Sequence, residues 1–180
     1  HIDQAMHSEW LQARPNTDIT IMLALAHALY TSGRHDQAFL DRYTVGFDRF
    51  VPYLTGASDG TPKTAEWAEA ISGLSAVRIR ALADELASGR TLLTAAWSLQ
   101  RARYGEQPFW MLVVLAAMIG QIGLPGGGFA FGLSSFNGVA NPVVRRRYGA
   151  LPQGQNPVQE AIPVARITEL SISALQVEMK

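Results

Sequence analysis

Two long apolar segments dominate the pattern of hydrophobic and polar positions along this chain. Residues 18–31 are apolar on most of their helical surface, which predicts a helix buried on more than one side. Thr17 or Asp18 precedes it as a cap, and Gly33 follows as a stop signal. The second segment predicts a buried helix over residues 106–122. Both helices are expected to lie inside a packed domain.

The segments between these two helices predict shorter elements. Residues 9–13 alternate like a strand or an extended entry to the domain. Capping residues, apolar spacing and glycine stops predict helices over 35–43, 64–72 and 75–88, a turn or helix over 47–54, and a strand over 91–96. The pattern is that of an α/β, helix-rich domain with few strands. Residues after Gly132 are rich in Gly, Asn, Pro and Gln and predict a long irregular segment.

A polar cluster, Trp97-Ser98-Leu99-Gln100-Arg101, follows the predicted strand directly. Open α/β sheets bind ligands at the carboxyl ends of their strands. Three consecutive glycines, 126–128, follow the second long helix and allow backbone to approach a neighbour closely. Together the two features predict a site for a large ligand. A buried aromatic at Trp97 and a surface cation at Arg101 explain the cluster equally well.

Composition narrows the class of protein. The chain has 180 residues, 48% of them hydrophobic, with 15 basic and 15 acidic side chains. A packed core is therefore expected, and a nucleic-acid partner is disfavoured because no basic excess is present. Arg145 to Arg147 is the one basic run and is interpreted as a solvated loop. The absence of cysteine excludes disulfides, thiolate metal sites and thiol catalysis.

Neither a membrane span nor a secretory signal is predicted. The apolar segment 109–125 is too short before its glycines, and no basic flank anchors it. The first ten residues lack the basic head and apolar core of a signal peptide. The compartment stays open.

Several familiar catalytic motifs do not occur. The glycines form neither a dinucleotide-binding fingerprint nor a phosphate-binding loop, and no serine lies in a nucleophile elbow. The four histidines lack metal-ligand spacing, so no metal site is predicted. His27, inside an apolar helix, is interpreted as a core histidine.

The turn at Pro15-Asn16-Thr17-Asp18 opens the first long helix. Free N–H groups at a helix start bind phosphate, and the carboxylate of Asp18 could accept two parallel hydrogen bonds from a guanine edge. Simple capping explains Thr17 and Asp18 without a ligand, and spacing alone favours that interpretation.

At this point the chain resembles a known family. It is similar to an internal part of the molybdopterin-guanine-dinucleotide oxidoreductases, in the branch of the DMSO, TMAO and biotin sulfoxide reductases. The residues that carry the resemblance are long and consecutive: RPNTDITIMLALAHALYTSGRHDQAFLDRYTVGFDRFVPYLTG (14–56), AEWAEAISGL (65–74), WSLQRARYGEQPFWMLVVLAAMIGQIGLPGGGFAFG (97–132) and NPVQEAIPVARITEL (156–170).

The resemblance implies a molybdenum enzyme that reduces S-oxides or N-oxides. It implies that Asn16, Thr17 and Asp18 contact a guanosine part of molybdopterin guanine dinucleotide, which reverses the preference for capping. It also implies that Ser98 and Gln100 approach the pterin, and that Trp97 and Arg101 border the substrate funnel. The implied fold is an incomplete Rossmann-like three-layer domain. The family occurs in the bacterial cytoplasm and periplasm.

The chain also departs from the family pattern. Such enzymes are several times longer, and nothing here matches the region of the serine that ligates molybdenum. We expect a partial α/β cofactor-binding domain over 9–133 and an extended irregular segment of the same domain over 134–170, with tails outside the family pattern at 1–8 and 171–180.

Two functions follow from the resemblance and the departures. In the first, the chain is a fragment of a molybdenum oxidoreductase, inactive alone and binding no cofactor by itself. Whether the chain counts as an enzyme is left open. Alternatively it is a non-catalytic, oligomeric binding or assembly module. The expected partners are the remaining domains of the parent enzyme or a second copy of the chain, with neither nucleic acid nor a membrane.

Overall fold

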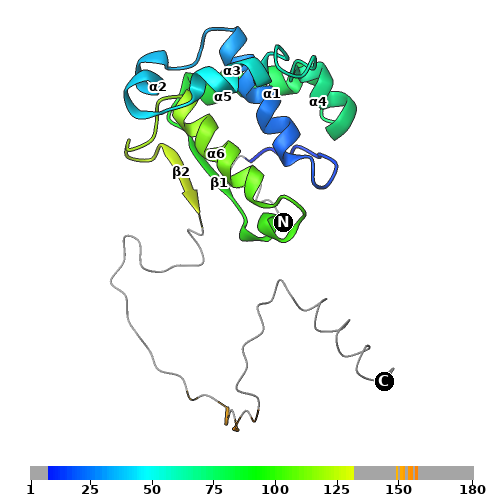
Figure 1. Cartoon of the computed structure of the whole chain (residues 1–180), viewed down its shortest axis with the longest axis vertical. Helices are drawn as coiled ribbons and strands as arrows, with labels where there is room; N and C mark the ends of the chain where they lie inside the picture. The colour runs from blue at the N-terminus through cyan, green and yellow to red at the C-terminus, as the bar shows by residue number, and fades with distance from the viewer. Residues whose placement is uncertain (1–7, 132–148, 150, 153, 156, 158–180) are drawn as a thin grey trace, which may run out of the picture. The chain divides into compact units, whose positions relative to one another are not determined.

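A computed structural model describes residues 8–131 and the scattered residues 149, 151–152, 154–155 and 157. Contacts divide the chain into two units, residues 1–141 and 142–180. All the helices and strands described lie in the first unit (Figure 1). The predicted irregular segment 134–170 and the predicted tails lie outside the described residues, apart from Ser8 and the scattered residues.

The order of elements agrees with the helix-rich α/β prediction, with one parallel pair of strands among the described residues. In chain order the elements are α1 (Asp18–Thr31), α2 (Gln37–Tyr43), α3 (Phe47–Leu54), α4 (Ala65–Ser72), α5 (Ala76–Ser88), β1 (Leu92–Ala95), the 3-10 helix η2 (Trp97–Arg101), α6 (Glu106–Met118) and β2 (Gly128–Phe131). Residues 9–13 form neither a helix nor a strand, and α6 ends before its predicted end at residue 122.

Local capping explains where several helices begin. The hydroxyls of Thr64 and Ser75 accept hydrogen bonds from backbone N–H groups in the first turns of α4 and α5. The carboxylate of Asp36 does the same for α2, through the N–H of Phe39 at 2.9 Å. Such bonds satisfy N–H groups that have no partner inside the helix, so the caps at Thr64 and Ser75 are confirmed as predicted.

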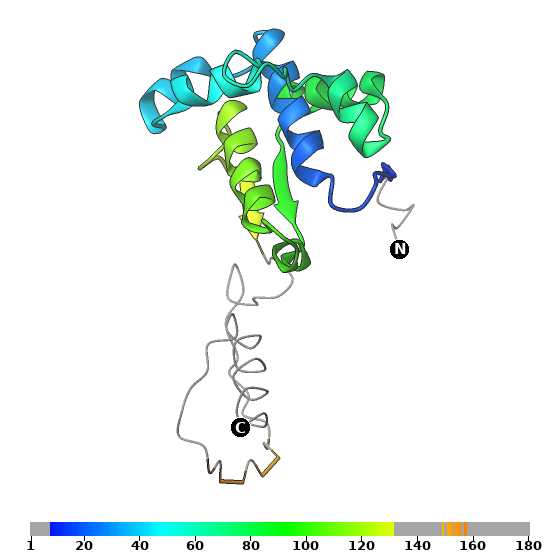
Figure 2. The same cartoon turned by 45° about the vertical axis from the view of Figure 1, so that its right-hand side comes forward.

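Strands β1 and β2 pair in parallel, with Leu92 opposite Gly128 and Ala95 opposite Phe131. The connection between them runs through η2 and α6, and α6 packs against both strands (Figures 1 and 2). Parallel pairing places the carboxyl ends of both strands at one edge, where η2 begins. A Rossmann-like three-layer arrangement needs more strands than this pair and stays a prediction.

Helix α1 forms the centre of the first unit and contacts α4, α5 and α6. Its buried side chains occupy nearly consecutive positions, Leu23 to Ala26 and Leu29, so burial on more than one side is confirmed. His27 lies half-buried in the same helix. Its burial holds the pKa of the imidazole below the ordinary histidine value, and the nearby carboxylate of Glu66 acts weakly in the opposite direction.

The glycine run 126–128 packs against the chain itself. A Cβ on Gly127 would lie 2.9 Å from Oε1 of Gln121, and one on Gly128, where φ is +84°, would lie 3.1 Å from the carbonyl oxygen of Gln121. Gly128 also begins β2, so the run lies at the amino end of that strand. The run therefore lies at the end of the strand pair opposite to η2, and its facing a large ligand together with residues 97–101 stays a prediction.

Candidate functional site

A pocket of about 440 Å³ lies between the start of α1 and the segment that joins η2 to α6. We call it the α1–η2 pocket. It is built by residues far apart in the sequence: Asn16, Asp18, Ile19, Leu99, Ala102, Arg103, Tyr104, Gly105, Gln107 and Pro108. The position agrees with the rule that open α/β sheets bind ligands beyond the carboxyl ends of their strands.

The turn at Asn16 forms one wall of the α1–η2 pocket. Asn16 is exposed and adopts φ +62°, a conformation that asparagine tolerates better than most residues. The hydroxyl of Thr17 donates to the carbonyl oxygen of Arg14 at 2.6 Å and makes no cap bond to α1. Capping of α1 by the Thr17 side chain is therefore wrong. The first turn of α1 borders the pocket without a side-chain cap, as an anion site at a helix start requires.

Arg14 fixes this turn to the neighbouring helix. Its guanidinium donates from Nη1 to the carbonyl oxygens of Ala70 and Ile71, both at 3.0 Å. The backbone N–H of Arg14 donates to the carbonyl oxygen of Ser72 at 2.9 Å. These acceptors are the last carbonyls of α4, which attract a cation. The turn that carries Asn16 is thus held by α4 as well as by α1.

The opposite wall is a tight loop between η2 and α6. Gly105 is buried, and a Cβ there would lie 2.4 Å from the carbonyl oxygen of Gln100. Only glycine fits this close approach. Tyr104 has φ +59°, which is uncommon for an aromatic residue, and its ring is exposed. The guanidinium of Arg103 lies over that ring, 4.9 Å from its centroid, and donates to the phenolic oxygen at 3.1 Å.

The structure distributes the predicted site residues over three positions. Asn16 and Asp18 line the α1–η2 pocket, whereas Thr17 is buried beneath the turn. The other four lie on η2 with exposed side chains and are not among the described residues that line the pocket: Trp97, Ser98, Gln100 and Arg101. Leu99 is the member of the polar cluster that reaches the pocket.

Sequence reasoning missed the residues after the cluster, above all Arg103, Tyr104 and Gly105. The glycine immediately before a long helix was the available signal, since it marks a close backbone approach. Nothing in the sequence indicated that Tyr104 would line the same pocket as Asn16, because that arrangement depends on how α1 packs against α6.

The chemistry of the pocket is that of binding. Its charged side chains are the carboxylate of Asp18 and the guanidinium of Arg103, accompanied by the amides of Asn16 and Gln107. The stacked pair of Arg103 and Tyr104 offers a flat surface of the kind that planar rings stack on. Within residues 8–131, no three acidic or histidine side chains gather in a group that could hold a metal ion.

Comparison with known proteins gives the family. A family model described as molybdopterin oxidoreductase matches residues 2–173. This chain belongs to the molybdopterin oxidoreductase family. It is 49% identical over 166 residues to a biotin sulfoxide reductase of Cereibacter sphaeroides, a match that covers 92% of this chain and 22% of the relative.

Two further relatives in this family show similar coverage. The chain is 48% identical to a dimethyl sulfoxide/trimethylamine N-oxide reductase of Cereibacter sphaeroides, over 89% of this chain and 21% of the relative. It is 43% identical to a trimethylamine-N-oxide reductase of Haemophilus influenzae, over 93% of this chain and 22% of the relative. The chain thus spans about a fifth of the length of these relatives.

The pocket suits part of a pterin dinucleotide. An uncapped helix start, a flat Arg103–Tyr104 surface and a carboxylate at Asp18 match a phosphate, a planar ring and a ring N–H edge respectively.

Within the part of the chain that the structure describes, no helix is both long and apolar enough to cross a membrane.

Proposed function

We propose that this chain contributes one wall of the molybdopterin guanine dinucleotide site of an S-oxide or N-oxide reductase. The observation that carries the proposal is the α1–η2 pocket, which brings the Asn16–Asp18 turn next to the loop after η2. These two segments are adjacent in space although helices α2 to α5 and strand β1 lie between them in sequence. Both belong to the stretches that resemble the family.

The turn at Asn16 and the helix η2 have different proposed tasks. Asp18 accepts hydrogen bonds from a guanine edge, and Asn16 and the N–H groups at the start of α1 orient the nucleotide and its phosphate. Thr17 holds the turn through its bond to Arg14. Ser98 and Gln100, exposed on η2, hydrogen-bond the pterin.

The remaining exposed side chains of η2, Trp97 and Arg101, border the substrate funnel in this proposal. Arg101 offers several N–H donors to an oxide oxygen or a phosphate. Molybdenum held by the dinucleotide would supply the oxygen-atom transfer, whereas these residues bind, orient and exclude water. Because the chain spans about a fifth of its relatives, we propose that turnover needs the remaining domains and that the chain alone is inactive.

A chimera tests this function. Residues 14–131 of this chain replace the aligned segment in the biotin sulfoxide reductase of Cereibacter sphaeroides, and molybdenum and guanine nucleotide content are measured after purification. The chimera is expected to retain the cofactor and to reduce an S-oxide. Substitutions Asp18→Ala and Gln100→Ala in the chimera are expected to lower cofactor content.

Asp84→Asn is the matched control, since Asp84 is an exposed carboxylate of α5 outside the pocket. A folded chimera that lacks the dinucleotide, or a loss equal in Asp84→Asn and Asp18→Ala, would contradict the proposal. Titration of the isolated chain with GMP adds an independent measure of the guanine contact.

Exposed aromatic side chains favour the second candidate, a module that assembles with itself. Tyr104 is 63% exposed and Trp110 is 65% exposed, in the loop and helix that flank the pocket. Exposed apolar side chains that form a contiguous patch mark interfaces, and in this candidate these two side chains belong to such a patch. Light scattering after size-exclusion chromatography tests this candidate: a concentration-dependent oligomer supports it, and a monomer at high concentration contradicts it.

A further inference from the structure

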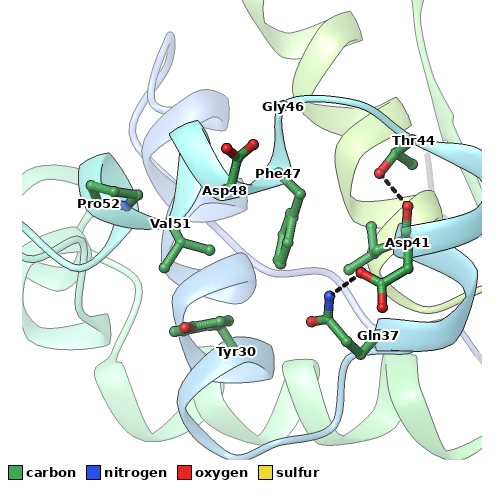
Figure 3. A pocket seen from close by; sticks show the side chains of 10 residues that line it. Tyr30, Gln37, Asp41, Thr44, Gly46, Phe47, Asp48, Val51 and Pro52 are labelled. Atoms are coloured by element: carbon green, nitrogen blue, oxygen red, sulfur yellow. Dashed lines mark hydrogen bonds between the residues drawn. The ribbon is translucent and has the colours of Figure 1, made fainter.

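A second cavity lies away from the α1–η2 pocket, between α1, α2 and α3. It measures about 500 Å³. Figure 3 shows its walls: Tyr30 comes from α1, Gln37 and Asp41 from α2, and Phe47 and Asp48 from α3. We call it the acidic cavity. None of the residues proposed to bind the dinucleotide lines it.

The charged side chains of the acidic cavity have one sign. Asp41 and Asp48 are both exposed, and neither takes part in an ion pair with any of the described residues. Asp41 accepts a hydrogen bond from Nε2 of Gln37 at 2.6 Å, which holds its carboxylate at the cavity wall. Asp48 lies in the first turn of α3. Two carboxylates without a cation among the lining side chains attract a positively charged ligand.

Aromatic rings form another wall of the same cavity. The rings of Tyr30 and Phe47 meet edge to face, with centroids 6.2 Å apart. Aromatic faces attract cations, most strongly organic ammonium ions that part readily from water. Carboxylates together with rings therefore favour an ammonium ion over a hydrated metal ion, for which oxygen ligands alone would suffice.

A smaller apolar cavity of about 150 Å³ adjoins the acidic one. The two share four lining residues, Leu40, Thr44, Gly46 and Phe47, and are therefore side by side. Val45 and Phe50 from the α2–α3 region and Val114 and Ala117 from α6 complete the apolar cavity. Val45 is fully exposed, so the cavity opens to solvent at this residue. An aliphatic chain fits these walls, whereas a second charge does not.

We propose that the two cavities form one binding site for an alkylammonium ion. The ammonium group occupies the acidic cavity between Asp41, Asp48 and the rings of Tyr30 and Phe47. Its aliphatic tail lies in the apolar cavity against Val45 and Val114. This site is separate from the dinucleotide pocket and does not depend on the proposed function.

Titration with n-hexylammonium, followed by backbone amide NMR shifts of the full chain, tests the site. Methylammonium lacks the tail, and 1-hexanol lacks the charge. Saturable shifts at α2 and α3 are expected with n-hexylammonium. Its affinity should exceed that of methylammonium by at least about tenfold, as burial of two methylene groups would give. It should exceed that of 1-hexanol by at least about fourfold, as two exposed ion pairs would give. The affinity is expected to fall as salt is raised, because the carboxylates are exposed.

Three variants assign the binding to these residues. Asp41→Asn and Asp48→Asn are each expected to weaken n-hexylammonium binding by roughly two- to fivefold, the effect of one exposed ion pair. Val45→Ser is expected to weaken n-hexylammonium binding and to leave methylammonium binding unchanged. Glu106→Gln is the control, because Glu106 is an exposed carboxylate outside both cavities that also accepts a bond from a neighbouring glutamine.

Circular dichroism confirms that each variant folds. The proposal is overturned if n-hexylammonium gives no saturable shifts. It is also overturned if 1-hexanol binds as tightly, or if Glu106→Gln weakens binding as much as the aspartate variants do.

Discussion

The side-chain amide of Gln121 bonds to the backbone of Thr91 and of Gly89, just before β1 begins. Its Oε1 accepts the N–H of Thr91 at 2.7 Å, and its Nε2 donates to the carbonyl oxygen of Gly89 at 2.6 Å. Gln121 follows α6, so this one buried side chain links the start of β1 to the segment that leads into β2. We expect this link to stabilise the pairing of the two strands.

Replacing Gln121 with methionine tests the link. Gln121→Met keeps the length of the side chain but leaves the N–H of Thr91 and the carbonyl of Gly89 without these partners. The free energy of unfolding is expected to fall by about 1–3 kcal/mol, measured by urea denaturation. Gln12→Met, at an exposed position, is expected to change it by less than about 0.5 kcal/mol. Equal stabilities for the two variants would refute the structural role of Gln121.

Alanine substitutions at Gly105 and Gly89 give a second matched comparison. A Cβ at Gly105 would lie 2.4 Å from the carbonyl oxygen of Gln100, whereas one at Gly89 would meet nothing within 4 Å. Gly105→Ala is expected to cost about 1–3 kcal/mol of stability and to displace the loop that carries Tyr104. Gly89→Ala is expected to be neutral or to stabilise by up to about 1 kcal/mol, through the unfolded chain. The two variants are compared by urea denaturation, and a Gly105→Ala variant as stable as Gly89→Ala would show that the close approach at Gly105 is unimportant.

The partial burial of His27 predicts how the free energy of unfolding changes with pH in the neutral range. Burial lowers the pKa of its imidazole, so the unfolded chain binds a proton more readily than the folded one. Stability is therefore expected to fall as pH drops through the ordinary value of 6.5 and to level off below the lowered pKa. An NMR titration of the His27 ring should give a midpoint below 6.5, and His27→Gln should flatten this part of the profile. A midpoint at or above 6.5 would contradict the burial argument.

The ion pair of Asp59 and Lys63 predicts a different pH dependence of stability, at acid pH. The ammonium group of Lys63, whose side chain is 3% exposed, donates to the Asp59 carboxylate at 2.6 Å. This bond, with a further bond from the N–H of Thr61, holds the pKa of Asp59 below its ordinary value. The stabilisation is therefore present above the unfolded pKa of about 3.9 and is lost as pH falls through the folded pKa.

The Asp59→Asn variant is expected to lower the urea midpoint at neutral pH, because Lys63 stays buried without its counter-charge. The difference from the unmodified chain should shrink below about pH 4, where protonated aspartate resembles asparagine. Asp84→Asn removes the partner of the half-exposed Arg34 and should have the smaller effect. A difference that stays constant with pH would contradict the ion-pair argument.

The sequence by itself determined the local elements of this protein. The apolar spacing over 18–31 predicted α1, and the hydroxyls of Thr64 and Ser75 predicted the starts of α4 and α5. The polar residues after residue 96 predicted the end of β1. These signals lie within one or two helical turns or within one strand, so neighbouring residues suffice to produce them. The family resemblance likewise needed only consecutive residues.

The tertiary structure decided what the local signals left open. Thr17 bonds to Arg14 instead of capping α1, because Arg14 is itself held by the last carbonyls of α4. The glycines at 127 and 128 lie close to Gln121, an approach that becomes visible only in the folded chain. The pocket between Asn16 and Tyr104 exists because α1 packs against α6, and such contacts between distant segments leave no mark in a local pattern of residues.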